Sequence, residues 1–110
     1  MNVLITGGSG FIGSSLAILL SSKNYKVIIY DININNTFHI NHKNISFVYG
    51  DTNDKNKLYK LIKLNNFDGI IHLAAISRVV VAENNQEECI RTNVYGTKTL
   101  IEVLEKKRLE

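Results

Sequence analysis

Residues 6–14 read TGGSGFIGS, and this stretch decides the fold. Its four glycines fall within seven positions, between the apolar run 3–5 and the largely apolar segment 15–20. Ordered glycine loses more conformational entropy than any other residue, so such a cluster between two regular segments indicates backbone that a side chain would obstruct. The segments before and after the glycines indicate which group approaches this backbone so closely.

The hydrophobic pattern alternates along the chain between strand-like runs and helix-like periods. Mostly apolar runs predict four strands, at 2–6, 26–31, 44–49 and 70–75. Segments with apolar residues three and four positions apart predict three helices, at 12–22, 54–64 and 85–107. The amide-rich stretch 33–44 predicts a loop.

Strands that are apolar along nearly their whole length predict a parallel sheet covered by helices on both faces. Right-handed crossovers leave few ways to connect such strands. We therefore predict an α/β fold, the first half of a Rossmann-like doubly wound sheet, with strand order 3-2-1-4 and three helices. With 110 residues and 45% hydrophobic content, the chain has room for one such module, residues 1–110.

Charge and cysteine content narrow the class of protein. Lys and Arg number 13 against 10 Asp and Glu, and the formal charge of +3 is dispersed, which argues against a nucleic-acid partner. The apolar runs are shorter than the roughly 18 residues that cross a bilayer, and no leader follows Met1, so we expect a soluble, cytoplasmic protein without a membrane partner. Cys89 is the one cysteine, which agrees with a reducing compartment, and nothing near it in sequence activates it as a thiol.

The glycine cluster lies between the first predicted strand and helix, where backbone N–H groups and the helix dipole favour an anion. Gly8, Gly10 and Gly13 have the spacing G-x-G-x-x-G, and Gly7, Gly10 and Gly13 have the spacing G-x-x-G-x-x-G. Asp31 ends the next strand, where a carboxylate accepts the hydroxyls of an adenine ribose. The pattern therefore predicts a dinucleotide whose pyrophosphate lies on the glycine turn.

The same region excludes one alternative and narrows the cofactor. A P-loop ends in Gly-Lys-Ser/Thr, but Ser14 and Ser15 follow Gly13. At Asp31 a 2′-phosphate would meet like charge, and no Arg stands in the loop that follows to compensate. The sequence therefore predicts NAD rather than NADP.

Five landmarks occur in order along the chain. They are TGGSGFIGS, Asp31, Gly50-Asp51, His72-Leu73-Ala74-Ala75 and Asn93-Val94-Tyr95-Gly96-Thr97. Together they resemble the N-terminal half of an extended short-chain dehydrogenase/reductase, and most closely the NAD-dependent epimerase/dehydratase family, over residues 2–107. Members such as UDP-glucose 4-epimerase and dTDP-glucose 4,6-dehydratase act on nucleotide sugars. The resemblance implies the NAD-binding portion of such an enzyme, truncated before its catalytic region and substrate domain.

The resemblance also implies roles for particular residues around the pyrophosphate and the adenosine. The residues expected to surround the pyrophosphate are Gly7, Gly10, Phe11, Ile12 and Gly13. Asp31 and Asn33 would hold the adenosine ribose. Asp51 and Thr52 would lie beside the adenine, with the Asp51 carboxylate reaching the exocyclic amine.

Further residues are assigned by the same resemblance toward the nicotinamide end. The small side chains expected to line the path to the nicotinamide ribose are Leu73, Ala74 and Ala75. Asn93 would tie the last helix to the fourth strand. Ser77 and Arg78 follow that strand, at a place where members of the family often bind their substrate. A role in substrate binding and a role as ordinary loop residues are equally consistent with the sequence.

The chain departs from the family in its catalytic residues. The family uses a Ser or Thr after a fifth strand and a Tyr-x-x-x-Lys pair on the next helix, and this sequence ends before both. Tyr59 and Lys63 match the spacing but fall on the second predicted helix, and we expect them to face solvent. No catalytic residue is therefore assigned, and the nucleotide sugar is expected as a partner only of the intact parent enzyme.

The histidines do not suggest a metal site. His39 and His42 lie in the amide-rich loop without the further ligands that zinc requires. His72 lies inside a predicted strand, and we expect a partly buried, hydrogen-bonded side chain rather than a catalytic base.

Two other functions are alternatives to the one that the family resemblance implies. One is a freestanding nucleotide-binding module without chemistry, which the absence of the catalytic pair favours for the chain as it stands. The other is a basic nucleic-acid-binding domain, against which the dispersed charge argues.

The fourth predicted strand would form an unpaired, apolar sheet edge, carrying Ile70, Ile71 and Leu73. Natural proteins cover or blunt such edges. We therefore expect either self-association through this strand or coverage of the edge by the last helix.

Overall fold

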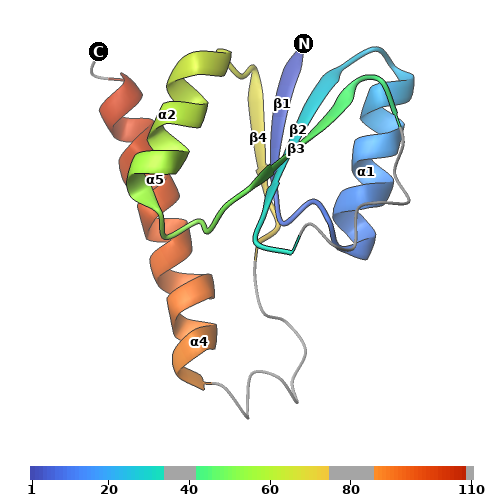
Figure 1. Cartoon of the computed structure of the whole chain (residues 1–110). Helices are drawn as coiled ribbons and strands as arrows, with labels where there is room; N and C mark the ends of the chain where they lie inside the picture. Colours follow the sequence, from blue (N-terminus) through green and yellow to red (C-terminus); the bar gives the residue numbers. More distant parts are fainter. Residues whose placement is uncertain (34–41, 75–85, 109–110) are drawn as a thin grey trace.

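The computed structural model describes residues 1–33, 42–74 and 86–108. Four strands, four α-helices and one π-helical segment follow one another along these residues (Figure 1). The strands are β1 (Asn2–Thr6), β2 (Lys26–Asp31), β3 (Ile45–Tyr49) and β4 (Gly69–His72). The helical segments are α1 (Phe11–Ser22), α2 (Lys55–Asn65), α4 (Gln86–Ile90) and α5 (Gly96–Arg108), with a π-helical segment, η2 (Arg91–Tyr95), between the last two.

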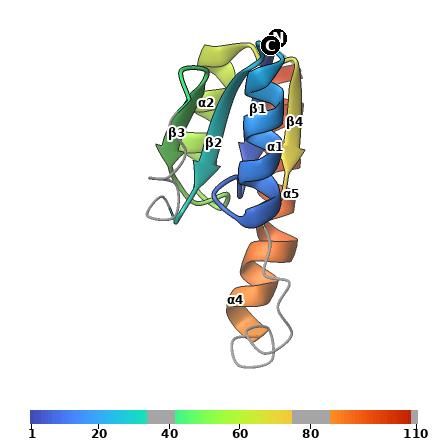
Figure 2. The same cartoon turned by 90° about the vertical axis from the view of Figure 1, so that its right-hand side faces the viewer.

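The four strands form one parallel sheet in the order β3-β2-β1-β4, which confirms the predicted doubly wound α/β fold. The register pairs Val3 with Val27 and, on the other side, with Gly69. Helix α1 covers one face of the sheet, and α2 and α5 lie together on the other (Figure 1). Because all strands run the same way, their carboxyl ends meet at one edge, and α4 extends past that edge (Figure 2).

Two hydrophobic clusters fill the space between the sheet and its helices, one on each face. Alternate residues of a strand point to opposite faces, which explains how one apolar run serves both clusters. The buried members on the α1 side are Val3, Ile5, Ala17, Val27, Ile29 and Ile45. Those on the α2–α5 side are Leu4, Tyr30, Leu58, Ile62, Leu100 and Val103.

Two predicted elements differ from those observed. Strand β4 ends at His72, so Leu73 and Ala74 follow the strand instead of belonging to it, and Ala75 lies outside the described residues. The predicted helix over 85–107 is interrupted by η2, in which the Gly96 N–H donates to the Arg91 carbonyl five residues before it. A search for the 3.6-residue period cannot detect such a turn, because the apolar residues on either side keep a helical spacing.

The chain turns from β3 toward α2 at Gly50, which packs flat against a buried tyrosine. A methyl group there would overlap the Tyr30 ring, and the Tyr30 hydroxyl is fixed by donating to the Asp51 carbonyl at 2.7 Å. Burial, and then the charges of Asp54 and Asp51, raise the pKa of Tyr30, so its hydroxyl stays a donor. The ring therefore has little freedom to move aside.

We expect Gly50→Ala to lower the free energy of unfolding by about 1–3 kcal/mol, since overpacking forces the Tyr30 ring or the backbone to shift. Gly69→Ala is the matched control, because no heavy atom lies within 4 Å of the added methyl group. That variant should be neutral or slightly stabilised, as Ala orders at a lower entropic cost than Gly. Urea unfolding of both variants measures the difference, and equal stabilities would contradict the packing argument.

Candidate functional site

The carboxyl ends of the strands are joined to one another by backbone hydrogen bonds. The Gly7 N–H donates to the Tyr30 carbonyl at 2.9 Å, which links the exit of β1 to β2. The Leu73 N–H donates to the Thr6 carbonyl at 2.8 Å, which links the exit of β4 to β1. The segments that leave β1, β2 and β4 therefore lie side by side, as the doubly wound fold requires at its ligand-binding edge.

The protein itself approaches three of the four glycines in the turn. Gly7 has a φ of +73°, and a Cβ there would lie 2.6 Å from the Ala74 nitrogen. A Cβ at Gly13 would lie 2.5 Å from the Gly8 Cα, and one at Gly8 would lie 2.7 Å from the Ile29 side chain. These glycines allow the turn, the first helix and the exit of β4 to pack against one another.

Gly10 differs, because it borders open space. Among the atoms of the described residues, the nearest to a Cβ placed there is the Gly7 carbonyl oxygen, at the ordinary contact distance of 3.7 Å. Gly10 is also the N-cap of α1, it makes no side-chain capping bond, and the first turn of the helix carries no acidic residue. The N–H groups of that turn and the positive end of the helix dipole are therefore available to an anion.

Two apolar side chains flank this helix end. Phe11 is 88% exposed and Ile12 is 68% exposed, although both lie in the first turn of α1. Neither side chain packs into the core, so both stand beside the open face of Gly10. A ligand on the helix end would remove part of this apolar surface from water.

Asp31 points toward the glycine turn. Its Oδ2 accepts hydrogen bonds from the Ser9 hydroxyl at 2.5 Å and from the Ser9 N–H at 3.1 Å. Its Oδ1 accepts from the Asn33 N–H at 2.8 Å, while Asn33 itself is exposed. A carboxylate offers about four acceptor positions, so one acceptor position of Asp31 stays open, on Oδ1, counting the bonds made by the described residues.

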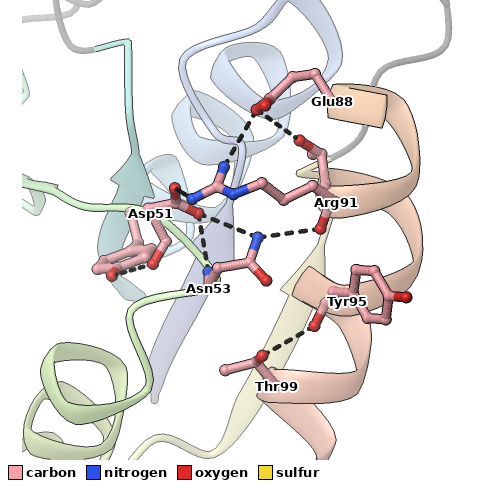
Figure 3. Close-up of polar contacts among 8 residues, drawn as sticks. Asp51, Asn53, Glu88, Arg91, Tyr95 and Thr99 are labelled. Carbon is pink, nitrogen blue, oxygen red and sulfur yellow. Dashed lines mark hydrogen bonds and ion pairs between the residues drawn. The ribbon is translucent and has the colours of Figure 1, made fainter. Parts of the chain in front are cut away.

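Asp51 lies after β3 in a polar cluster that the sequence did not predict (Figure 3). Its Oδ1 accepts from the Asn53 N–H at 2.8 Å, and its Oδ2 pairs with the Arg91 Nη2 at 2.5 Å. Burial raises the pKa of Asp51, but the bonds from Asn53 and Arg91 outweigh it and lower the pKa below the ordinary value. Thr52 is buried beneath Gly96, where a Cβ would lie 2.5 Å from its Oγ1.

His72 confirms the expectation of a partly buried, hydrogen-bonded side chain. The Thr97 hydroxyl donates to the Asn93 carbonyl at 3.0 Å, so it accepts from the His72 Nε2–H at 2.9 Å. In the neutral ring, Nδ1 accepts from the Thr6 hydroxyl at 2.5 Å. Burial lowers the pKa of His72 and favours the same neutral form.

Asn93 was expected to tie the last helix to β4. In the structure its carbonyl oxygen takes part in that link, through Thr97 and His72. Its side-chain amide donates to the Cys89 Sγ at 3.3 Å. The contribution of the Asn93 side chain to a ligand site stays a prediction.

The nicotinamide end of the predicted site is described in part. Leu73 and Ala74 are half-buried where β4 ends, and Ala74 lies against Gly7. Three residues of the sequence analysis, Ala75, Ser77 and Arg78, lie outside the described residues, as does His39.

The expectation that Tyr59 faces solvent was wrong. Its ring packs against the α2–α5 cluster, and the Lys106 Nζ stands 4.2 Å from the ring centroid. Lys63 stands 5.6 Å from the same centroid. The reason is that α5 covers this side of α2, so the Tyr-x-x-x-Lys match serves packing between two helices.

The described parts of the chain contain neither a metal-binding cluster nor a membrane span, and one cavity within them lies away from the glycine turn. Residues 1–33, 42–74 and 86–108 contain no group of three His, Cys, Asp or Glu that could hold a metal ion. Within the same ranges, none of the helices has the length and apolar character needed to span a bilayer. A cavity of about 400 Å³ lies at the amino ends of the strands, near Asn2, Lys26 and Phe67, and so is separate from the glycine turn.

A model of the GDP-mannose 4,6 dehydratase family matches residues 4–110. The chain belongs to this family. A curated relative of the dehydratase family, the inverting UDP-N-acetylglucosamine 4,6-dehydratase of Campylobacter jejuni, is 36% identical over 107 residues, covering 92% of this chain and 31% of its own length. The chain therefore spans about a third of the length of the curated relatives it matches.

Solved structures related to the dehydratase family have the same fold. UDP-glucose 4-epimerase of Bifidobacterium longum, in complex with NAD+ and UDP, superposes with a TM-score of 0.85 at 29% identity, over 100% of this chain and 35% of that one. dTDP-glucose 4,6-dehydratase of Bacillus anthracis, in complex with NAD, superposes with a TM-score of 0.79 at 35% identity, over 97% of this chain and 34% of that one. The resemblance inferred from the five sequence landmarks is thereby confirmed.

The neutral state of His72 makes stability depend on pH. Its pKa is lowered in the folded chain, so as the pH falls below the ordinary value of 6.5 the unfolded chain binds a proton that the folded chain resists. Stability should therefore decrease with falling pH in that window, by at most about 1.4 kcal/mol per pH unit.

Urea unfolding between pH 7 and pH 5 measures this dependence, with His72→Gln as the comparison. The glutamine cannot titrate, so its profile should be flatter than that of the original chain. Parallel profiles would show that another group is responsible.

Proposed function

We propose that this chain binds NAD as the dinucleotide-binding portion of a nucleotide-sugar epimerase or dehydratase. The observation that carries the proposal is the position of the Asp31 carboxylate, which is bonded to the glycine turn beside the open face of Gly10. One short surface thus offers N–H groups for a diphosphate and a carboxylate for a ribose. Relatives that contain NAD share this fold and support the proposal.

The residues present fit a dinucleotide lying across the carboxyl edge of the sheet. The pyrophosphate would lie on the first turn of α1, because Gly10 leaves room there and no acidic side chain repels it. The residues proposed to surround it are Gly7, Gly10, Phe11, Ile12 and Gly13. Gly7 and Gly13 act indirectly in this arrangement, by allowing the close packing that shapes the turn.

The adenosine would lie across the ends of β2 and β3. Asp31, held by Ser9 and Asn33, keeps one acceptor position for a ribose hydroxyl. Asp51 would accept from the exocyclic amine of the adenine, with Thr52 beneath. A 2′-phosphate would bring like charge to Asp31, so NAD is preferred to NADP.

The nicotinamide ribose would lie toward the exit of β4, near Leu73, Ala74 and Ala75, with Asn93 supporting that side. When bound, NAD supplies the acceptor for a hydride from the sugar carbon that bears the hydroxyl to be oxidised. This chain's residues bind and orient the cofactor, and none of them is proposed to transfer a proton. Catalysis on a nucleotide sugar is proposed for the parent enzyme, whose relatives are about three times as long as this chain.

Calorimetric titration with NAD, NADP and a short DNA duplex tests the proposal. Binding of NAD that is tighter than that of NADP is expected, without binding of the duplex. Binding of mononucleotides as tight as that of NAD would favour a general nucleotide-binding module. Salt-sensitive binding of the duplex would favour a nucleic-acid-binding domain.

Gly10→Ala should weaken NAD binding by about tenfold or more while leaving the fold intact. Its methyl group would fill the open space at the helix end, yet it would meet no protein atom closer than 3.7 Å, and the backbone angles of Gly10 suit alanine. Gly69→Ala adds the same methyl group far from the turn and should bind NAD normally. Unchanged NAD affinity in Gly10→Ala would mean that the pyrophosphate lies elsewhere.

We also propose that the chain self-associates through β4. Within the described residues β4 pairs with β1 alone, and the half-buried side chains of Ile70 and Ile71 lie beside its open edge. Sedimentation equilibrium should show a mass that rises with concentration. A monomeric mass at all concentrations would contradict this proposal.

A further inference from the structure

Arg91 is held at both ends by the segment that follows β3. Its Nη2 pairs with the Asp51 Oδ2 at 2.5 Å, and its carbonyl oxygen accepts from the Asn53 Nδ2 at 3.0 Å. Its other guanidinium nitrogen, Nη1, pairs with the Glu88 Oε1 at 3.2 Å (Figure 3). The arginine is therefore oriented by three residues from two different parts of the chain.

The π-helical turn explains how Arg91 reaches this position. Gly96 must face Thr52, because a Cβ on that side would lie 2.5 Å from the Thr52 Oγ1. Residues five apart in an α-helix point about 140° away from each other, since each residue turns about 100°. In the π-turn the Gly96 N–H bonds to the Arg91 carbonyl, which brings the two residues to the same side of the helix. Arg91 therefore faces the segment after β3, as Gly96 does.

Arg91 fixes the orientation of the Asp51 carboxylate, which still has one position that can accept a hydrogen bond. Oδ1 accepts from the Asn53 N–H at 2.8 Å and from its Nδ2 at 3.4 Å. Oδ2 accepts from Arg91, and this short bond fixes the rotation of the carboxylate. Of the roughly four acceptor positions of a carboxylate, one on Oδ2 is left, counting the bonds within the described residues. A carboxylate in this state accepts hydrogen bonds and donates none.

We propose that Arg91 is a positioning residue for base recognition, orienting Asp51 so that it accepts a hydrogen bond from a base carrying an exocyclic amino group. The inference rests on the proposed function, which puts the adenine of NAD beside Asp51. A base with a carbonyl oxygen at that position offers no donor and sets one oxygen against another. Arg91 therefore gives the site its preference for an adenine dinucleotide.

The test compares NAD with nicotinamide hypoxanthine dinucleotide, in which a carbonyl oxygen replaces the adenine amine. Calorimetry on the full chain should give NAD an advantage of roughly tenfold or more, the worth of a hydrogen bond to a charged group. Arg91→Met keeps an unbranched apolar stem but removes the guanidinium with its charge and donors, and it should reduce that advantage to about threefold or less. Arg91→Lys keeps a charge near Oδ2 without the fork to Glu88, so it should restore part of the advantage.

Lys98→Met is the matched control. It removes one cation from α5, the helix that follows η2, where Lys98 is exposed and pairs loosely with Glu102 at 3.7 Å. It should leave the ratio of the two affinities unchanged. If Arg91→Met weakens both dinucleotides equally, its role is structural and the inference is overturned. If the original chain binds neither dinucleotide, the proposed function itself fails.

A second readout needs no cofactor. NMR titration of the Asp51 carboxyl carbon should show a higher pKa in Arg91→Met than in the original chain, because Arg91 helps to hold that pKa down. The pKa of Asp51 in Lys98→Met should equal that in the original chain. Among the described residues, Tyr30 interacts with the charges of Asp51 and Asp54, and Glu88 pairs with Arg91; both variants retain these three other ionisable groups. An unchanged pKa in Arg91→Met would show that Arg91 does not act on the carboxylate and would overturn the inference.

Discussion

The contact between Gly7 and the exit of β4 is the constraint on which the candidate site depends. Gly7 adopts a positive φ and leaves no space for a Cβ, because the Ala74 nitrogen and the Leu73 carbonyl carbon lie within 2.7 Å of that position. These are backbone atoms, and they cannot move aside as a side chain could. The turn after β1 is therefore pressed against β4 on one side, while the Gly7 N–H bonds to β2 on the other. Gly10 is left facing outward at the start of α1.

Much of this architecture could be predicted because it depends on local patterns. Apolar runs predicted the four strands, and handedness predicted their order, since a parallel sheet with short connections has few topologies. The length of β4 and the π-turn could not be predicted. Leu73 and Ala74 are as apolar as strand residues, yet β4 ends at His72 and their backbone packs against Gly7. The π-turn ends where Gly96 packs closely against Thr52, a residue far away in sequence.

In the site, too, features that depend on nearby residues could be predicted, and those that depend on residues far apart in sequence could not. Asp31 is directed by Ser9 and Asn33, which belong to the turn and to its own loop, so a motif that includes the turn already contains much of the information. Asp51 is directed in part by Arg91, which comes 40 residues later and reaches it only through the π-turn. The landmark Asn93-Val94-Tyr95-Gly96-Thr97 drew attention to that helix, but not to the arginine just before it. Tyr59 shows the opposite error, in which a known spacing occurs where its residues pack between two helices.

The carboxylates of Asp31 and Asp51 therefore differ in how substitutions can alter their orientation. A substitution that moves Asp31 also disturbs the glycine turn, because Ser9 lies between Gly8 and Gly10 and bonds to Asp31 through both its backbone and its hydroxyl. Arg91 is partly exposed, and its guanidinium lies outside both hydrophobic clusters. Changing it alters the direction of Asp51 while Gly96 and Thr52 keep the helix in place. In the proposed site, backbone packing would fix where the dinucleotide lies, and the partly exposed Arg91–Asp51 pair would adjust which base is preferred.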